Sequence, residues 1–270
     1  MEKGANAGEW QILNNNFELT DYSLPITSVH TSLADGDVAI DDCFICSART
    51  LEKMNATRRK MNEAFQFAET IAKLQNYRVS VVAHVKGRML PGIRSEIVAY
   101  LQDIFKKYPD CDLALENSML LNKKLSIRSG VKPEDVPGIV KYLRDIMSGV
   151  GLDHRIYSVL DTCHALSTVR CMNTILHGVI EDADELEVLE KYFINTAPYC
   201  KIVHFNYLKN LGFGEDHGIT LSDSEIDPIL NLFLKYTPDV DLVIEIREDD
   251  YNDSKNFKLT VKQIKDILYL

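Results

Sequence analysis

The sequence predicts an α/β fold, specifically a TIM-type (β/α)8 barrel in which the first strand is missing or degenerate. Short β-branched apolar runs alternate with amphipathic segments along the 270 residues. The runs are apolar throughout, as expected of parallel strands that are buried on both faces. Regular alternation of such strands with helices indicates parallel strands joined by right-handed crossovers.

Seven runs are predicted as strands, and they end at polar side chains in six cases. The runs cover residues 9–13, 26–30, 79–85, 112–117, 156–161, 201–206 and 242–246. A (β/α)8 barrel has eight strands. The first eight residues resemble the tail of a helix that ends at glycine, so the first strand is the one that we expect to be missing or degenerate.

The amphipathic segments between the runs are predicted as helices. They cover residues 49–75, 92–108, 132–147, 182–196, 224–236 and 261–270. Proline and acidic residues near the start of the 132–147 segment are typical of a helix N-terminus. Because there is no repeat, low-complexity segment or linker, we expect one domain over residues 1–270.

Composition excludes several classes of protein. No apolar stretch reaches the roughly 18 residues of a membrane helix, and the first ten residues lack the charged-then-apolar pattern that we would expect of a signal peptide. We therefore expect a cytoplasmic protein without a membrane partner. Six scattered cysteines are too few for a disulfide scaffold, and Cys43 and Cys46 form only a lone CxxC pair. The net charge of −10 argues against nonspecific coating of DNA but leaves room for a local basic groove.

Polar side chains stand where the predicted strands end. A single buried acid or histidine at such a place is ordinary, but the C-terminal ends of parallel barrel strands meet at one rim. Buried carboxylates and imidazoles that gather there require a cation, and their ligand atoms suit Zn²⁺ or Mn²⁺. The candidate ligands at the strand ends are His30, His84, Glu116, Asp161, His204 and Glu245.

Three further residues extend this set. In the stretch YSVLDTCHAL, His164 follows Asp161 by three residues, so the two side chains either bind a ligand or mark a strand end that turns into a helix. Glu215 and His217 are spaced to point the same way in an extended loop, and with His164 they could form a third metal site. The alternative for that pair is a solvated loop.

These motifs resemble the endonuclease IV family of apurinic/apyrimidinic endonucleases, within the xylose-isomerase-like TIM barrels. The resemblance covers nearly the whole chain from Glu9 onward. It rests on VH at 29–30, AH at 83–84, LEN at 115–117, LDTCHA at 160–165, HFN at 204–206, EDH at 215–217 and IE at 244–245.

The resemblance implies a centre with up to three Zn²⁺ ions, or Mn²⁺, that hydrolyses DNA on the 5′ side of an abasic site. It implies that Glu116 bridges two ions, and that Glu116 and Glu245 are catalytic. It assigns His30 and His84 to the first ion, Asp161, His204 and Glu245 to the second, and His164, Glu215 and His217 to the third. We further expect the substrate to contact Asn117, Asn206, Lys86 and Arg88.

The sequence also departs from the family pattern, and two other functions therefore stay open. Asp216 and Tyr207 replace an arginine and an aspartate of the family, and the loop after His30 lacks the family's tyrosines. A divalent-metal-dependent sugar or sugar-phosphate isomerase or epimerase would need only Glu116, Asp161, His204 and Glu245, with a small sugar as substrate. A metal-retaining barrel that acts only as a binding module is the third possibility.

Overall fold

The computed structural model describes residues 26–31, 34–35, 38–39, 51–85, 94–120, 130–176, 183–207, 222–246 and 255–268. The chain divides into two compact units. The first comprises Met1–Leu115 and Tyr142–Tyr157, and the second comprises Glu116–Lys141 and Ser158–Leu270. The single domain over residues 1–270 stays a prediction.

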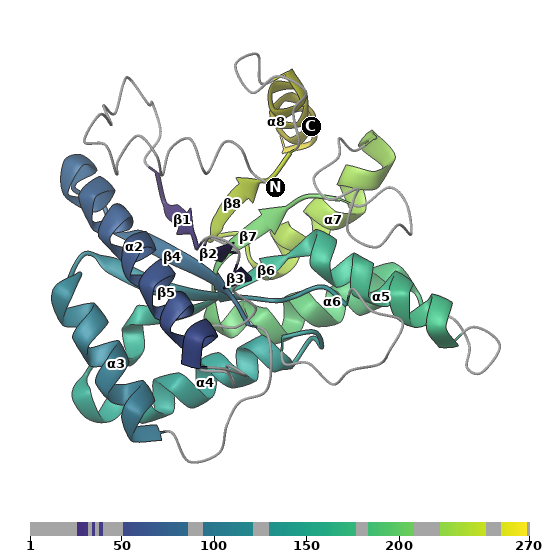
Figure 1. Ribbon diagram of the computed structural model, residues 1–270. Helices are drawn as coiled ribbons and strands as arrows, with labels where there is room; N and C mark the ends of the chain where they lie inside the picture. The colour runs from purple at the N-terminus through teal and green to yellow at the C-terminus, as the bar shows by residue number, and fades with distance from the viewer. Residues whose placement is uncertain are drawn as a thin grey trace. The chain divides into compact units, whose positions relative to one another are not determined.

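The first unit places parallel strands beside two long helices (Figure 1). Strand β1 (Ser28–His30) pairs in parallel with β4 (Val79–His84), in a register that sets His30 opposite Val82. Strand β5 (Cys111–Glu116) neighbours β4, and all of β5 except Glu116 belongs to this unit. Helix α2 (Leu51–Gln75) packs against β1 and β4, and α3 (Arg94–Lys107) leads into β5. A short antiparallel pair, β2 (Ala34–Asp35) and β3 (Val38–Ala39), precedes α2.

Aromatic packing and a buried ion pair hold the first unit together. The Phe65 ring packs 6.3 Å from that of Phe105, centroid to centroid, and 5.9 Å from that of Tyr108. At the start of β5 the buried Asp112 carboxylate accepts hydrogen bonds from Arg78 and from Arg155. The guanidinium of Arg155 also donates to the carbonyl oxygen of Phe105. The Asp112 charge is thus paired as a buried charge must be.

The second unit repeats the strand–helix order. Strand β6 (Ile156–Asp161), whose last four residues lie in this unit, pairs in parallel with β7 (Cys200–Phe205), which pairs with β8 (Asp241–Ile244). The described helices here are α5 (Thr162–Leu176), α6 (Glu185–Thr196), α7 (Asp223–Tyr236) and α8 (Lys255–Leu268). Helix α4 (Asp135–Met147) begins in this unit, and its last six residues belong to the first. Short 3-10 helices cover Ser148–Val150, Asp153–Arg155 and Ala197–Tyr199.

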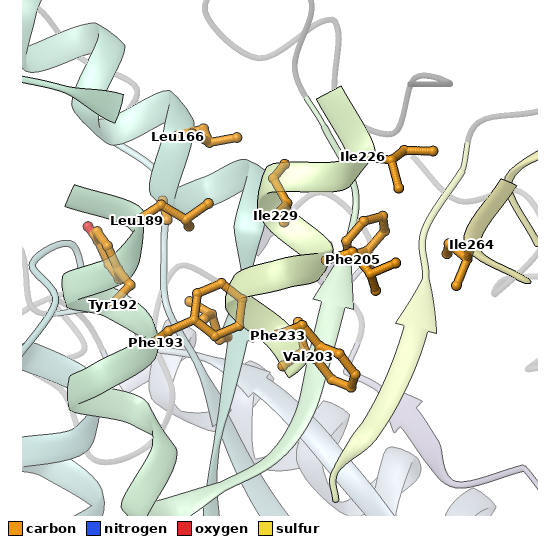
Figure 2. Close-up of a cluster of buried hydrophobic side chains, with 13 residues drawn as sticks. Leu166, Leu189, Tyr192, Phe193, Val203, Phe205, Ile226, Ile229, Phe233 and Ile264 are labelled. Atoms are coloured by element: carbon orange, nitrogen blue, oxygen red, sulfur yellow. The ribbon is translucent and has the colours of Figure 1, made fainter. Parts of the chain in front are cut away.

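One apolar cluster fills the space between strands and helices of the second unit (Figure 2). Val203 and Phe205 of β7 meet Leu189 and Phe193 of α6, and α7 and α8 contribute further side chains. The contributions of α7 and α8 are Ile226, Ile229, Leu230, Phe233 and Ile264. Burying each large apolar side chain stabilises the fold by about 1.5–3 kcal/mol. This packing sets the positions of β6, β7 and β8, whose ends carry the polar side chains Asp161, His204 and Glu245.

The predicted elements match most of the described ones, with several differences. Strand β6 has the predicted bounds, and β1, β4, β5, β7 and β8 differ from theirs by one or two residues. The short pair β2 and β3 was not predicted. Helix α4 begins at Asp135 rather than 132, because the Asp135 carboxylate accepts from the backbone N–H groups of Val131 and Lys132 and ends the preceding turn. Helix α8 begins six residues before the predicted 261. Helix α5 was not among the predicted helices.

The coarser part of the fold prediction is confirmed, since both units are α/β with parallel strands. The predicted strand at 9–13 lies outside the described residues, so a missing or degenerate first strand and closure into an eight-stranded barrel stay predictions. Among the described helices, none combines the length and the apolar character that crossing a membrane requires.

Candidate metal centre

Four candidate ligands lie at or just beyond strand ends and belong to the second unit. Glu116 and Asp161 are the last residues of β5 and β6, and His204 is the last but one of β7. Glu245 follows the end of β8 directly. The parallel register sets Asp161 opposite His204, so their side chains emerge at the same level of the sheet. Strand register thus brings together residues that lie up to 129 positions apart in the chain.

The ligand atoms of Glu116, Asp161 and His204 all lie within 4.8 Å of one another, and all three residues are buried. The Nδ1 atom of His204 is 3.1 Å from Oε1 of Glu116 and 3.1 Å from Oε1 of Glu245. The side chain of Glu245 is 30% exposed, whereas that of Glu116 is 1% exposed. Glu245 is therefore the member of the four that faces solvent.

Charge accumulates around His204. Burial by itself would lower the pKa of its imidazole, but the carboxylates of Glu245, Glu116 and Asp161 outweigh burial and raise that pKa to about 10. Near neutral pH the ring is therefore an imidazolium, whose proton lies between two carboxylates. Two buried carboxylates, an imidazole and a partly exposed carboxylate form a donor set that could hold a divalent metal ion. The structure thus contains a cluster that could bind a metal, as predicted.

His164 is held beside this cluster by the first turn of α5. Its backbone N–H donates to Oδ1 of Asp161 at 2.7 Å, so Asp161 acts as the N-cap of α5. Nδ1 of His164 is 2.8 Å from the backbone carbonyl oxygen of Asn117 and 3.6 Å from Oε1 of Glu116. A carbonyl oxygen only accepts, so Nδ1 carries the hydrogen and Nε2 is the nitrogen that can bind a metal.

The stretch YSVLDTCHAL therefore combines the two alternatives that the sequence left open. It is a strand end that turns into a helix, because β6 ends at Asp161 and α5 begins at Thr162. It also supplies Asp161 to the cluster and places His164 beside it. Cys163, between them, is buried.

Two buried asparagines connect these strand ends. Oδ1 of Asn117 accepts from the backbone N–H of Asp161 at 2.7 Å, and its Nδ2 donates to the Asp161 carbonyl oxygen at 3.0 Å. Nδ2 of Asn206 lies 3.1 Å from Oδ2 of Asp161 and 3.2 Å from Oε2 of Glu245. From the sequence we expected both asparagines only to contact substrate, and that contact stays a prediction. The hydrogen bonds to Asp161 and Glu245 were not expected. The available signal was their position, directly after a strand and next to an acidic or histidine ligand.

His30 and His84 come together in the first unit, at the ends of the adjacent strands β1 and β4. Their ring centroids are 4.8 Å apart and the ring planes are inclined by 53°. Nδ1 of His30 is 2.8 Å from the carbonyl oxygen of Thr31. By the same reasoning as for His164, Nε2 is the His30 nitrogen that can bind a metal.

The remaining candidate residues lie outside the described residues. They are Glu215 and His217 of the third metal site, together with Lys86 and Arg88 as substrate contacts. A third ion and a basic substrate contact therefore stay predictions.

Comparison with known proteins leaves the family open. No family model matches the sequence, and none of the curated proteins matches either. Among solved structures, the chain is similar to that of a candidate alpha-L-fucosidase from Bacteroides thetaiotaomicron, with 9% identity and a TM-score of 0.38. The alignment covers 75% of this chain and 74% of that chain. A likeness this low carries no argument about fold or function.

Proposed function

We propose that this protein is a divalent-metal-dependent phosphodiester hydrolase that resembles endonuclease IV and cleaves DNA 5′ to abasic sites. The observation that carries the metal dependence is the buried group of Glu116, Asp161 and His204, whose ligand atoms lie within 4.8 Å of one another. Glu245 approaches the same His204 nitrogen. We propose Zn²⁺ or Mn²⁺ as the metal, in up to three sites.

The protein's own residues would divide the work as follows. Bound metal ions supply positive charge that activates water and stabilises the developing charge on phosphorus and on the leaving oxygen. Glu116 and Asp161 are buried and fixed by neighbours, so they would hold a metal ion rigidly. Glu245 is partly exposed and can exchange a proton with substrate or solvent at Oε1 once His204 no longer occupies that oxygen.

The His30–His84 pair favours the hydrolase over a sugar enzyme. The resemblance to sugar isomerases extends to only four positions, namely Glu116, Asp161, His204 and Glu245. Two imidazoles 4.8 Å apart at neighbouring strand ends would then have no role in the reaction. In the hydrolase they are ligands of the first ion.

The second candidate is a sugar or sugar-phosphate isomerase or epimerase with one divalent ion. It is favoured by the arrangement of Glu116 and Glu245, which face the same nitrogen of His204 at equal distances of 3.1 Å. Two carboxylates on either side of a small substrate could move a proton between adjacent carbon atoms. The net charge of −10 also suits a small substrate better than DNA.

The test begins with metal content and an abasic-site DNA duplex. The hydrolase predicts up to three zinc or manganese equivalents per chain and cleavage 5′ to the abasic site, whereas one equivalent with no cleavage favours the isomerase. Absence of cleavage by fully metal-loaded protein would rule out the hydrolase. Absence of any bound divalent ion would rule out both functions.

Two substitutions separate the schemes further. Glu116→Ala should abolish activity in either scheme, because this carboxylate belongs to the metal centre in both. His217→Ala should reduce activity severely, by about a hundredfold or more, only in the hydrolase, since the isomerase has no third ion for it to hold. Initial rates with abasic DNA and with aldose or ketose substrates measure both effects.

A further inference from the structure

The side chain of Asn206 hydrogen-bonds ligands from two different strands of the proposed metal centre. It is completely buried, directly after β7, and it touches two of the four proposed ligands. Nδ2 lies 3.1 Å from Oδ2 of Asp161 and 3.2 Å from Oε2 of Glu245. One amide nitrogen, which carries two hydrogens, can donate one hydrogen bond to each carboxylate.

The orientation of this amide is determined by its other end. Oδ1 of Asn206 lies 3.0 Å from the backbone nitrogen of Cys163, in the first turn of α5. A backbone N–H can only donate, so the atom that faces Cys163 must be the oxygen, and the nitrogen must face the carboxylates. The first turn of α5 therefore decides that Asn206 presents hydrogen-bond donors, and not an acceptor, to Asp161 and Glu245.

The backbone of Asn206 is fixed as well. Its N–H donates to Oγ1 of Thr162 at 3.2 Å, and the Thr162 hydroxyl donates to the Asn206 carbonyl oxygen at 2.7 Å. Both contacts come from the first residue of α5. Because hydrogen bonds hold both its backbone and its side-chain amide, Asn206 has little freedom to move with the carboxylates. The carboxylates must therefore orient towards its N–H groups.

We propose that Asn206 is a positioning residue for the metal centre, which holds the carboxylates of Asp161 and Glu245 in the orientation that binds the ion. The inference rests on the proposed metal-dependent function. It adds to that function a residue that binds no metal itself and acts through two ligands from different strands. Groups that orient metal ligands in this way commonly change metal affinity by 10- to 100-fold when they are removed.

The proposal explains why an amide, and not a carboxylate, occupies this position. An aspartate here would set a third acidic group about 3 Å from two others, which would repel them. An aliphatic side chain would fill the space but leave two carboxylates without their donor. Asparagine supplies two N–H groups without adding charge, so the net charge that attracts the ion stays with Asp161, Glu245 and Glu116.

The test compares Zn²⁺ affinity in the full-length chain and in the variants Asn206→Ala and Asn206→Leu. The leucine variant keeps the volume and loses the hydrogen bonds, whereas the alanine variant loses both. The ion to follow is the one whose binding disappears in Asp161→Ala. We expect both Asn206 variants to bind this ion 10- to 100-fold more weakly in a titration against a chelating indicator.

Asn117→Ala is the matched control, because Asn117 is a buried asparagine that hydrogen-bonds the backbone of Asp161 and no ligand carboxylate among its described contacts. This variant should lower the unfolding temperature and change the Zn²⁺ affinity less than threefold. Equal losses of affinity in the Asn117 and Asn206 variants, or unchanged affinity in either Asn206 variant, would overturn the proposal.

Different results would contradict the proposed metal-dependent function and the positioning role of Asn206. If the wild-type chain binds no Zn²⁺ or Mn²⁺, the proposed function fails, and with it the role of Asn206. If the wild-type chain binds the ion and Asn206→Leu binds it equally well, only the positioning role fails. Should Asn206→Leu not fold, Asn206→Ala gives the same comparison.

Discussion

At the scale of single residues, the centre is an arrangement of acids around one imidazole. Glu116, Glu245 and Asp161 surround His204, whose Nδ1 lies 3.1 Å from two of them. The sequence predicted which residues these would be, because each stands at the end of a recognisable strand. It could not predict that His204 would carry a proton between two of the carboxylates, since that depends on distances set by register and rotamers.

The raised pKa of His204 predicts that metal binding releases a proton. In the metal-free protein this pKa is about 10, so near pH 7.5 an ion must displace the proton from the imidazole. The apparent affinity should therefore rise roughly tenfold for each unit by which the pH increases, until the pH reaches about 10. Calorimetric titration with Zn²⁺ in two buffers of different ionisation enthalpy measures the protons released, and a value of zero would contradict the prediction.

The raised pKa of His204 also makes the stability of the metal-free protein depend on pH. The pKa is raised above the ordinary value of 6.5, so the folded state binds the proton more tightly than the unfolded state. This contribution to stability is complete below pH 6.5 and is lost as the pH rises through 10.

At the scale of elements, α5 is the described α-helix that the sequence did not predict. Its segment TCHALSTVRCMNTIL mixes threonine, valine and polar residues, and it was not predicted as a helix. Its start depends on Asp161, whose carboxylate caps the first turn by accepting from the N–H of His164. Asp161 thus serves both the helix and the candidate metal centre. In contrast, α6 and α7 have apolar faces with helical spacing, and each was predicted to within about three residues.

The core between α6 and β7 allows a direct test at this scale. Phe193 is completely buried in α6, whereas its neighbour Ile194 is 49% exposed on the same helix. Phe193→Ala should lower the free energy of unfolding by about 3–5 kcal/mol, because it removes buried contacts and leaves a cavity. Ile194→Ala is the control and should change it by about 0.5 kcal/mol or less. Urea denaturation followed by circular dichroism measures both, and similar losses would contradict the described packing.

At the scale of the whole molecule, an ion that binds only the folded chain must stabilise it. The candidate ligand cluster combines the ends of β5, β6, β7 and β8, so the unfolded chain has no comparable site. An ion present at a thousand times its dissociation constant would raise the free energy of unfolding by about 4 kcal/mol.

Removing the metal should therefore destabilise the folded protein. Treatment with a chelator should lower the unfolding temperature by several degrees, and adding back Zn²⁺ or Mn²⁺ should restore it. Scanning calorimetry at fixed pH gives both values. The variant Asp161→Ala serves as the control, and its unfolding temperature should respond weakly to the ion. A wild-type chain whose unfolding temperature ignores both chelator and metal would count against a metal centre in the second unit.

The sequence by itself determined the order of the longer strands and of most helices, and the residues that end those strands. It did so because both are local properties: apolar runs define strands, and chain position places His204 or Glu245 at their ends. Only the tertiary structure decided which atoms meet. Contacts of 3–4 Å among Glu116, His164, Asn206 and Glu245 depend on register, side-chain rotamers and the cap of α5, which no local pattern of residues records.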